Sequence, residues 1–495
     1  MPAIRLEPLG VIHEVAHGAP LSDVLFGHGV EFPCGGRGTC GRCRGKITSG
    51  SVAIAQADRT TFAQTELDAG WRLLCQAEVA GDATIAVDQW QTMVLADDRR
   101  VAGGGEGLGI AIDLGTTTLA AQLVDRVTGA VLAVATGLNP QGRHGADVMS
   151  RIQFACRENG AEVMRDLIRS ELGRMAAGLR QQAAERPIAV VTIVGNTAMH
   201  HLFCGIDPAP LAAVPFHPVE DGLQRFTDAE LGWDLGGAAV RFLPCLGGFV
   251  GSDILAGILA TGMHRSDRLE VLIDLGTNGE IVVGNRHGML CAATAAGPAF
   301  EGANISIGMR AATGAISAVR HDGQQLAVSV LGGGPARGIC GSGLVDAVAC
   351  ALDLGRILPS GRLADGAKFV PLTAELALAA ADVRQLQLAK GATAAGIYLL
   401  LAQLGHRPDD VARVHLAGAF GNYIVRANAE RIGLLTFREE QVAAVGNTAL
   451  LGAKLALLTP DDDYGLLRSQ VTHVGLHEDP SFEDAYITAM AFPAR

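Results

Sequence analysis

The stretch IAIDLGTTT, at residues 110–118, combines a short apolar run with a glycine turn that starts after Asp113. An apolar run of this length that ends in a turn is typical of a buried strand. The turn offers backbone N–H groups and threonine hydroxyls to a phosphate chain, and an aspartate at the end of a strand can hold Mg²⁺, usually through water. One such turn is weak support for a nucleotide site, because Asp-Gly turns are also common in hairpins.

This motif occurs twice in the chain. The second copy, LIDLGTNG, lies at residues 272–279, and another motif, VGNTA, occurs at residues 194–198 and again at 445–449. We interpret each half as a strand, a DLGT turn and a strand, followed later by a strand, a GNTA segment and a helix. Two related halves that face each other predict a cleft, with one phosphate-binding turn on each side.

A boundary precedes the duplicated body. Residues 97–107 are first charged and then rich in glycine, which is typical of a flexible linker. We predict a domain at residues 1–89, a linker at 90–107 and a body at 108–495, with halves at about 108–269 and 270–495. Apolar strands, glycine turns and alanine-rich helices alternate in the body, as in α/β domains. It has neither a lysine-containing Walker loop nor a G-x-G-x-x-G after a strand, so P-loop and Rossmann folds are excluded.

The first domain contains a distinctive set of cysteines, Cys34, Cys40, Cys43 and Cys75. Three are close together and the fourth is remote, whereas zinc sites favour two short pairs. Three plus one is the pattern of a [2Fe–2S] ferredoxin. The glycines of residues 33–43 would let backbone N–H groups approach the cluster sulfurs. We predict these four cysteines as cluster ligands, with a zinc site and plain buried thiols as alternatives.

The cysteine loop resembles that of the β-grasp ferredoxins, with five residues in its first gap. The resemblance implies a small sheet of short strands wrapped around a helical turn. A domain of this size has a small apolar core, so we expect the cluster to hold the fold together as well.

Composition limits the kinds of partner that the chain can have. It has 495 residues, which suggests about three domains, and 49% hydrophobic with 18% charged residues is typical of globular proteins. The net charge of −12 argues against nucleic-acid binding, because phosphate contacts need a basic surface. We find no apolar run long enough to span a membrane and no signal peptide at the N-terminus, so we expect a cytoplasmic protein without membrane contact.

The body resembles the actin, heat-shock-protein and sugar-kinase superfamily of ATPases. This resemblance implies an α+β multidomain protein in which a duplicated α/β, ribonuclease H-like ATPase domain follows the β-grasp domain, with ATP and Mg²⁺ as ligands. Residues 414–422, VHLAGAFGN, look like the adenosine-binding turn of that superfamily, and the two VGNTA segments resemble its connecting helices at the hinge. The implied nucleotide-binding residues are Asp113, Gly115, Thr116, Thr117, Thr118, Asp274, Gly276, Thr277, Asn278, Gly418 and Gly421.

Two acidic residues are candidates for catalysis. Asp253 lies in a glycine-rich turn that opens an alanine-rich helix, where it is either the helix N-cap or a ligand of Mg²⁺ or of the attacking water. Glu280 follows the second DLGT turn and is a candidate to orient the attacking water. The turn GICGSGL, at residues 338–344, either faces the nucleotide or is a plain helix start capped by Ser342. We interpret the pair His200-His201 as a packing or surface pair, and the six cysteines after residue 100 as inert core thiols.

An electron carrier alone needs no ATP, and a sugar kinase needs no iron. A chain that combines a ferredoxin with an ATPase suits the transfer of an electron to an acceptor of lower reduction potential. The whole chain resembles the reductive activators of corrinoid proteins, which return Co(II) corrinoids to Co(I) so that methyl transfer can resume. The resemblance implies a corrinoid protein of a methyltransferase system as partner, and a low-potential flavoprotein or ferredoxin as electron donor. The stretches that carry this likeness beyond the general ATPase pattern are residues 139–141, 145–148, 150–152, 247–253, 296–303, 307–311 and 387–392.

Two departures from known activators stand out. Longer members have a further domain between ferredoxin and ATPase, which this chain lacks, so the formation of a homodimer stays open. Other ATP-driven activators carry [4Fe–4S] clusters near the C-terminus, but no cysteine follows Cys350 here. Two alternatives are an ATP-driven electron donor to another low-potential metalloenzyme and a small-molecule kinase with an appended redox-sensing ferredoxin domain.

Overall fold

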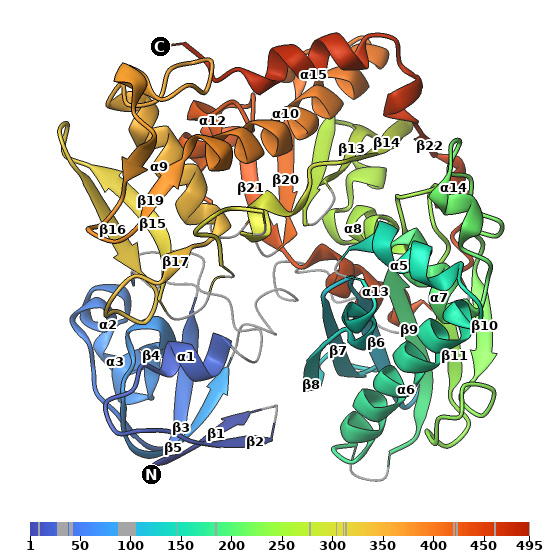
Figure 1. Cartoon of the computed structure of the whole chain (residues 1–495). Coiled ribbons are helices and arrows are strands. Elements are labelled where there is room, and N and C mark those ends of the chain that lie inside the picture. The colour runs from blue at the N-terminus through green and yellow to red at the C-terminus, as the bar shows by residue number, and fades with distance from the viewer. Residues whose placement is uncertain are drawn as a thin grey trace.

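The computed structural model describes residues 1–7, 10–26, 38, 43–87, 105–145, 147–183, 186–276, 279–302, 304–309, 311, 314–418, 421, 424–459 and 462–494. Within these ranges the chain forms a five-stranded sheet near the N-terminus and two six-stranded sheets, with helices around them (Figure 1). Over the same residues, no helix combines the length and the apolar character that crossing a membrane requires.

The N-terminal domain is a mixed sheet folded around one short helix. Apolar side chains alternate along its strands, so that Ile4, Leu6 and Ile85 are fully buried against Leu21 and Leu25 of the helix. The strand order is β2-β1-β5-β3-β4, and the first two strands pair antiparallel. The elements are β1 (Ala3–Glu7), β2 (Val11–Glu14), α1 (Leu21–Phe26), β3 (Arg44–Val52), α2 (Gln56–Thr61), α3 (Gln64–Asp68), β4 (Trp71–Leu73) and β5 (Val79–Val87).

The first half of the body is a six-stranded sheet in the order β10-β11-β9-β6-β7-β8. One face of the sheet is covered by helices, since Ile110 and Ile112 pack in one apolar core with Met164, Ile168 and other residues of α6. The elements are β6 (Leu108–Leu114), β7 (Thr118–Asp125), β8 (Val131–Leu138), α5 (Val148–Ala155), α6 (Gly160–Arg180), β9 (Ile188–Gly195), α7 (Thr197–Cys204), β10 (Gln224–Thr227) and β11 (Ala239–Phe242).

The second half has a six-stranded sheet in the order β21-β20-β12-β13-β14-β22. Its first five strands correspond to β11-β9-β6-β7-β8 of the first half, and each sheet has one further edge strand, β22 here and β10 there. Its sheet consists of β12 (Glu270–Leu275), β13 (Gly279–Asn285), β14 (Gly288–Thr294), β20 (Arg413–Ala417), β21 (Val442–Gly446) and β22 (Val471–His473). The surrounding helices are α9 (Gly341–Asp353), α10 (Ala380–Gln403), α12 (Arg426–Arg431), α14 (Gly465–Ser469) and α15 (Phe482–Met490). Two small sheets flank them, formed by β15 (Ala315–His321), β16 (Leu326–Val330) and β17 (Gly338–Ile339), and by β18 (Phe369–Pro371) and β19 (Ala377–Ala379).

Two helices, α8 (Ser252–Thr261) and α13 (Thr448–Leu458), lie between the two six-stranded sheets (Figure 1). They pack closely, because a side chain on Gly452 of α13 would collide with the backbone of Ala256 in α8. Their apolar residues share one core with Ala111 of the first sheet and Leu272 of the second. This shared core joins the halves where the resemblance implies a hinge, and we call it the hinge core.

The strand order confirms the predicted duplication around the DLGT turns and corrects one detail of it. Strands β6 and β12 hold equivalent places, but the first VGNTA follows β9, whereas the second follows β21. The strand equivalent to β21 is β11, which leads to α8. The prediction that the two VGNTA segments are equivalent connecting helices is therefore wrong for α7, and α8 takes that role. The shared letters reflect a common helix start, since an asparagine caps both α7 and α13.

The N-terminal domain rests against the first half of the body. Val131 and Val134 of β8 are buried in the same apolar core as Ile4 and Leu6 of the N-terminal sheet. Among the described residues, Val131 and Val134 are the side chains that the body contributes to this apolar core.

Candidate nucleotide and cluster sites

The first DLGT turn is a tight hairpin that neighbouring backbone and side chains hold in place. Strands β6 and β7 pair up to Leu114 and Leu119, and the N–H of Gly115 donates to the carbonyl of Thr118 at 3.1 Å. The Asn139 amide donates to the Gly115 carbonyl at 3.0 Å, and the Asn139 N–H donates to the carbonyl of Thr117 at 2.9 Å. These bonds fix the conformation of the turn, and Gly115 uses its own N–H within it.

Two asparagines connect helix starts to this turn. Asn196 caps α7 by accepting from the N–H of Met199 at 3.0 Å, and its amide donates to the Thr116 hydroxyl at 2.8 Å. Asn447 caps α13, and its amide donates to Asp113 Oδ2 at 2.8 Å. Neither asparagine is among the site residues predicted from the sequence. The repeated VGNTA motif was the available signal, but it was interpreted only as part of a hinge helix.

Three aspartates lie close enough together for their charges to act on one another. Asp113 and Asp274 are the last residues but one of β6 and β12, and Asp253 lies in the first turn of α8. Burial raises the pKa of Asp113 to about 6. Burial and the charge of Asp113 raise the pKa of Asp274 to about 7. Burial, followed by the charges of Asp274 and Asp113, raises the pKa of Asp253 to about 7. Three acids that repel one another in a shielded place favour a bound cation.

The structure decides one alternative for Asp253. The N-cap of α8 is Gly251, and Asp253 is two residues further on, where it accepts from the N–H of Ile254 at 2.9 Å. Of the two alternatives for Asp253, the N-cap role is therefore wrong. Among the described residues, no three acidic, histidine or cysteine side chains are close enough to form a ready-made metal site.

The second DLGT turn is described in part. Asp274, Leu275 and Gly276 are placed, whereas Thr277 and Asn278 lie outside the described residues. Strands β12 and β13 pair so that Asp274 lies directly opposite Glu280. Residues directly opposite each other in an antiparallel pair project from the same face of the sheet. The structure thus brings Glu280 beside Asp274, and Glu280 is nearly buried.

The two predicted glycines of the adenosine turn have different surroundings. Gly418 has a φ of +81°, and a Cβ there would lie 2.7 Å from Asp274 Oδ1 and 3.0 Å from the Leu275 carbonyl. A Cβ on Gly421 would lie 2.9 Å from the side chain of Leu416, which is close to it in the sequence. Gly418 therefore contacts the acidic cluster directly, whereas Gly421 is required by local packing.

Substituting Gly418 with valine is expected to weaken nucleotide binding at least about tenfold and to destabilise the fold by about 1–3 kcal/mol. A β-branched residue is strained at this φ, and its side chain would displace Asp274. Thermal melting and calorimetric titration with Mg·ATP measure the two effects. Gly405→Val is the matched control, because Gly405 has a φ of +74° and a Cβ there would meet no atom within 4 Å. Equal nucleotide affinity in the two variants would contradict this account of Gly418.

Three further residues singled out in the sequence have structural roles. Helix α9 begins at Gly341 with Cys340 as N-cap, and Ser342 donates to the Ser317 carbonyl at 2.9 Å, so the predicted cap by Ser342 is wrong. His200 and His201 are fully buried, and their rings bond to the carbonyls of Gly222 and Thr197. The interpretation of this histidine pair as a packing pair is confirmed.

Two of the four predicted cluster ligands are described, and they lie together. Cys43 directly precedes β3, Cys75 lies in the turn after β4, and their Sγ atoms are 3.1 Å apart without a disulfide. The N–H of Leu74 donates to the Cys43 carbonyl at 2.8 Å, which fixes the two segments to each other. Two thiols at this separation fit ligands of a single iron, so this part of the donor set suits an iron–sulfur cluster. Cys34 and Cys40 lie outside the described residues.

The described cysteines of the body show no such grouping. Cys245, Cys291, Cys340 and Cys350 are buried as free thiols, and burial raises the pKa of each. A raised pKa keeps a thiol protonated and poorly reactive, which agrees with the prediction of inert core thiols for these four. The same prediction is wrong for Cys156, which is exposed, and Cys204 is only partly buried.

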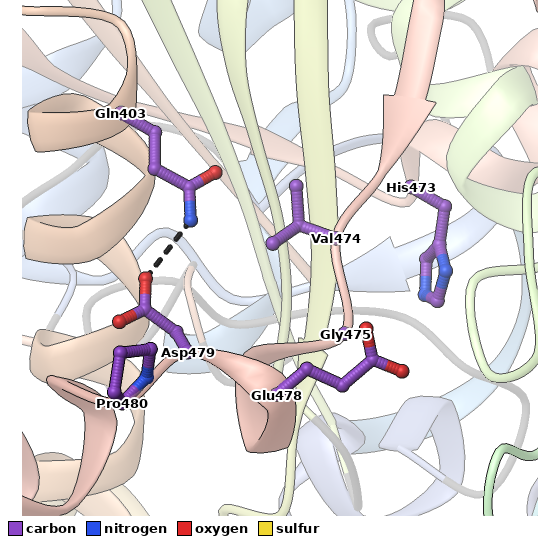
Figure 2. Close-up of a pocket in the computed structure, with 7 residues that line it drawn as sticks. All are labelled: Gln403, His473, Val474, Gly475, Glu478, Asp479 and Pro480. Carbon is purple, nitrogen blue, oxygen red and sulfur yellow. Dashed lines mark hydrogen bonds between the residues drawn. The ribbon is translucent and has the colours of Figure 1, made fainter.

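A separate hollow of about 310 Å³ lies where α10 ends. Figure 2 shows Gln403 and Asp479 facing each other on one side of it, with an amide to carboxylate hydrogen bond of 3.0 Å, and His473 on the other side. The remaining lining residues belong to the segment 474–480. None of the predicted nucleotide-binding or cluster-binding residues line this hollow.

Comparison with family models accounts for nearly the whole chain. Residues 4–80 match the model of a 2Fe-2S iron-sulfur cluster binding domain. Residues 108–266 match the RACo middle region, and residues 268–495 match the C-terminal domain of RACo, described as the ASKHA domain.

Two curated relatives and one solved structure are similar over most of their lengths. The corrinoid activation enzyme RamQ of Eubacterium limosum is 35% identical over 78% of this chain and 70% of its own length. The [Co(II) methylated amine-specific corrinoid protein] reductase of Methanosarcina barkeri is 27% identical over 78% of this chain and 77% of its own. The structure of a reductive activator for corrinoid,iron-sulfur protein matches with a TM-score of 0.68 and 26% identity, over 100% of this chain and 98% of that one.

Proposed function

The chain belongs to the RACo family of corrinoid activation enzymes, and we propose that it reduces the Co(II) corrinoid of a methyltransferase system to Co(I) in an ATP-dependent reaction. The observation that carries the proposal is the combination of two sites in one chain. Cys43 and Cys75 lie 3.1 Å apart in the N-terminal domain, and Asp113, Asp253 and Asp274 converge between two halves that share a hinge core.

The cysteines of the N-terminal domain would hold the electron carrier. Cys34, Cys40, Cys43 and Cys75 supply four thiolates, and a [2Fe–2S] cluster bound to them supplies one electron at low potential, near ~−400 mV for plant-type clusters. An acceptor about 100–200 mV lower makes the transfer uphill by roughly 2–5 kcal/mol. A conformational switch that depends on nucleotide binding supplies free energy of this size.

The cleft residues would bind Mg·ATP from both halves. The threonines of the first turn, Thr116 to Thr118, and the second turn after Asp274 would hold the phosphates. The three aspartates would hold Mg²⁺ through water, and the ion would relieve their mutual repulsion. Glu280, which lies opposite Asp274 in the strand pair, would orient the attacking water. The helices α8 and α13 both begin at the cleft, where their N–H ends favour negative charge.

We further propose the partners and the location. The corrinoid belongs to the partner protein, and the electron arrives from a low-potential flavoprotein or ferredoxin. The acidic net charge of −12 makes nucleic acid an unsuitable partner. A cytoplasmic location would place the protein with methyltransferase systems, and a homodimer is compatible with the proposal but is not required by it.

An anaerobic absorbance time course tests the proposed function. It contains the purified protein, a low-potential reductant and a Co(II)-loaded corrinoid protein from a methyltransferase system, with and without Mg·ATP. We expect the Co(I) spectrum to appear only with Mg·ATP. A metabolite that stimulates ATP turnover and becomes phosphorylated, with no Co(I) formed, would instead support the kinase alternative.

A further inference from the structure

The hydrogen bond from Asn447 to Asp113 crosses from the second half of the body to the first. The two residues are 334 positions apart in the chain, and the distance from Asn447 Nδ2 to Asp113 Oδ2 is 2.8 Å. Asp113 belongs to the first DLGT turn, whereas Asn447 follows β21 of the second sheet. This bond therefore ties the phosphate-binding turn of one half to a helix that comes from the other half.

Both ends of the Asn447 side chain are engaged, so its orientation is fixed. Its Oδ1 accepts from the N–H of Leu450 at 2.8 Å and caps α13, and its Nδ2 holds Asp113. Helix α13 is itself held in the hinge core, where Gly452 leaves no room between it and α8. The position of the Asp113 carboxylate thus depends on the position of the hinge helix.

The chemistry of an amide suits this place. The carboxylate of Asp113 lies close enough to Asp253 and Asp274 for their charges to act on one another. A neutral N–H donor holds Oδ2 without adding charge, and in the described part of the chain no hydrogen bond occupies Oδ1 of Asp113. The free oxygen is then available to a metal-bound water, in a direction set by the amide.

We propose that Asn447 is a positioning residue for the Mg·ATP site, which orients Asp113 and links it to the hinge helix α13. The inference rests on the proposed function, because it takes Asp113 to serve the Mg²⁺ ion. Asn196 shares the VGNTA motif but has a different role: its amide binds the Thr116 hydroxyl within the same half. The asparagines of the two motif copies therefore bind different groups. Asn196 binds a hydroxyl of its own half, whereas Asn447 binds a carboxylate of the other half.

The test separates the two roles of Asn447, the hydrogen bond from its side-chain amide to Asp113 and the cap of α13. Asn447→Ser keeps a side chain that caps helices well and loses the amide donor to Asp113. Asn447→Asp also keeps the cap but places a fourth carboxylate in the cluster. Both variants of the full-length protein are titrated with Mg²⁺ at fixed ATP, with ATP turnover and calorimetric binding of Mg·ATP as readouts, and their thermal melting is recorded.

We expect Asn447→Ser to raise the Mg²⁺ concentration for half-maximal activity about tenfold or more, as for a lost hydrogen bond to a charged group. Saturating Mg²⁺ should restore most of the turnover, because the site itself is still present. Asn447→Asp should lose more affinity than the serine variant. The control is Asp147→Ala, which removes an exposed N-cap whose carboxylate accepts from Ser150 N–H at 2.8 Å, and which should melt earlier with an unchanged Mg²⁺ dependence.

Two results would overturn the inference. One is an Asn447→Ser variant with the Mg²⁺ dependence of the wild type. The other is a change in Mg²⁺ dependence of the same size in Asp147→Ala, which would mean that lost stability alone explains it. A wild-type protein that binds no Mg·ATP would overturn the proposed function together with this inference, so the two failures are distinguishable.

Discussion

Replacing Cys75 with serine is expected to remove the visible absorbance of the N-terminal cluster and to lower corrinoid reduction to the uncatalysed rate. Cys75 lies 3.1 Å from Cys43, so one substitution disrupts a pair of neighbouring ligands. The residues beside it, Leu73 and Leu74, are fully buried in a small core. Loss of the cluster should therefore also loosen the domain. Absorption spectra, iron content and circular dichroism of the purified variant measure these effects.

The body should be unaffected in the same variant. It has its own apolar cores, and its cleft residues come from other strands. We therefore expect Cys75→Ser to retain Mg·ATP binding while corrinoid reduction is lost. Cys156→Ser is the matched control, because Cys156 is an exposed free thiol far along the chain from the ligand set. An unchanged iron–sulfur spectrum in Cys75→Ser, or zinc in place of iron in the wild type, would refute the ligand assignment.

The parts of the fold that local sequence patterns determine were predictable. Paired strands flank each DLGT motif at the predicted place, β6 and β7 at the first and β12 and β13 at the second, because a short apolar run that ends at a glycine is typical of a buried strand. Cys43 and Cys75 were assigned to one site from their spacing, and their thiols are adjacent. The spacing of four cysteines encodes a ligand set almost independently of the surrounding fold.

Strand order was not predictable from the same patterns. The two VGNTA segments look equivalent, but one follows β9 and the other β21, which hold different places in their sheets. The five-residue motif determines how a helix begins, because its asparagine is the N-cap. Strand pairing, in contrast, depends on contacts between segments that are distant in the sequence. The bond between Asn447 and Asp113 spans 334 positions and leaves no periodic signal in the sequence. The cap of α8 was misplaced by two residues for a simpler reason, since both Gly251 and Asp253 are acceptable N-caps.

The corrected equivalence explains why a duplicated fold has an asymmetric site. Helices α8 and α13 occupy the same place in the two halves, and each begins at the cleft. The start of α8 carries the acid Asp253, and the start of α13 carries the amide Asn447. One connecting helix thus supplies a candidate ligand for Mg²⁺, and the other supplies a neutral donor that holds Asp113. A second acid in place of the amide would crowd the cleft with a fourth negative charge.

Substituting Asp253 with asparagine is expected to stabilise the nucleotide-free protein above pH 7 while lowering ATP turnover by about 10²–10³. Burial and the charges of Asp274 and Asp113 raise the pKa of Asp253 to about 7, from an ordinary value of 3.8. Between these two pH values the folded protein keeps a proton that the unfolded chain has released. The carboxylate therefore destabilises the fold progressively as the pH rises from 4 to 7, and its full cost is present above pH 7.

Asparagine cannot ionise, so the variant avoids this cost and gains stability only where the wild type is charged. We expect a gain of about 1–3 kcal/mol at pH 8, or about 2–5 °C in Tm, and no gain near pH 4. Asp409→Asn, an exposed carboxylate outside the cleft, should show no gain at either pH. Saturating Mg·ATP should stabilise the wild type more than the variant, because the ion neutralises the charge that asparagine lacks. If Asp253→Asn melted earlier than the wild type at pH 8 and kept its ATP turnover, Asp253 would be a structural residue, and the cleft would have to bind its cation through Asp113 and Asp274 alone.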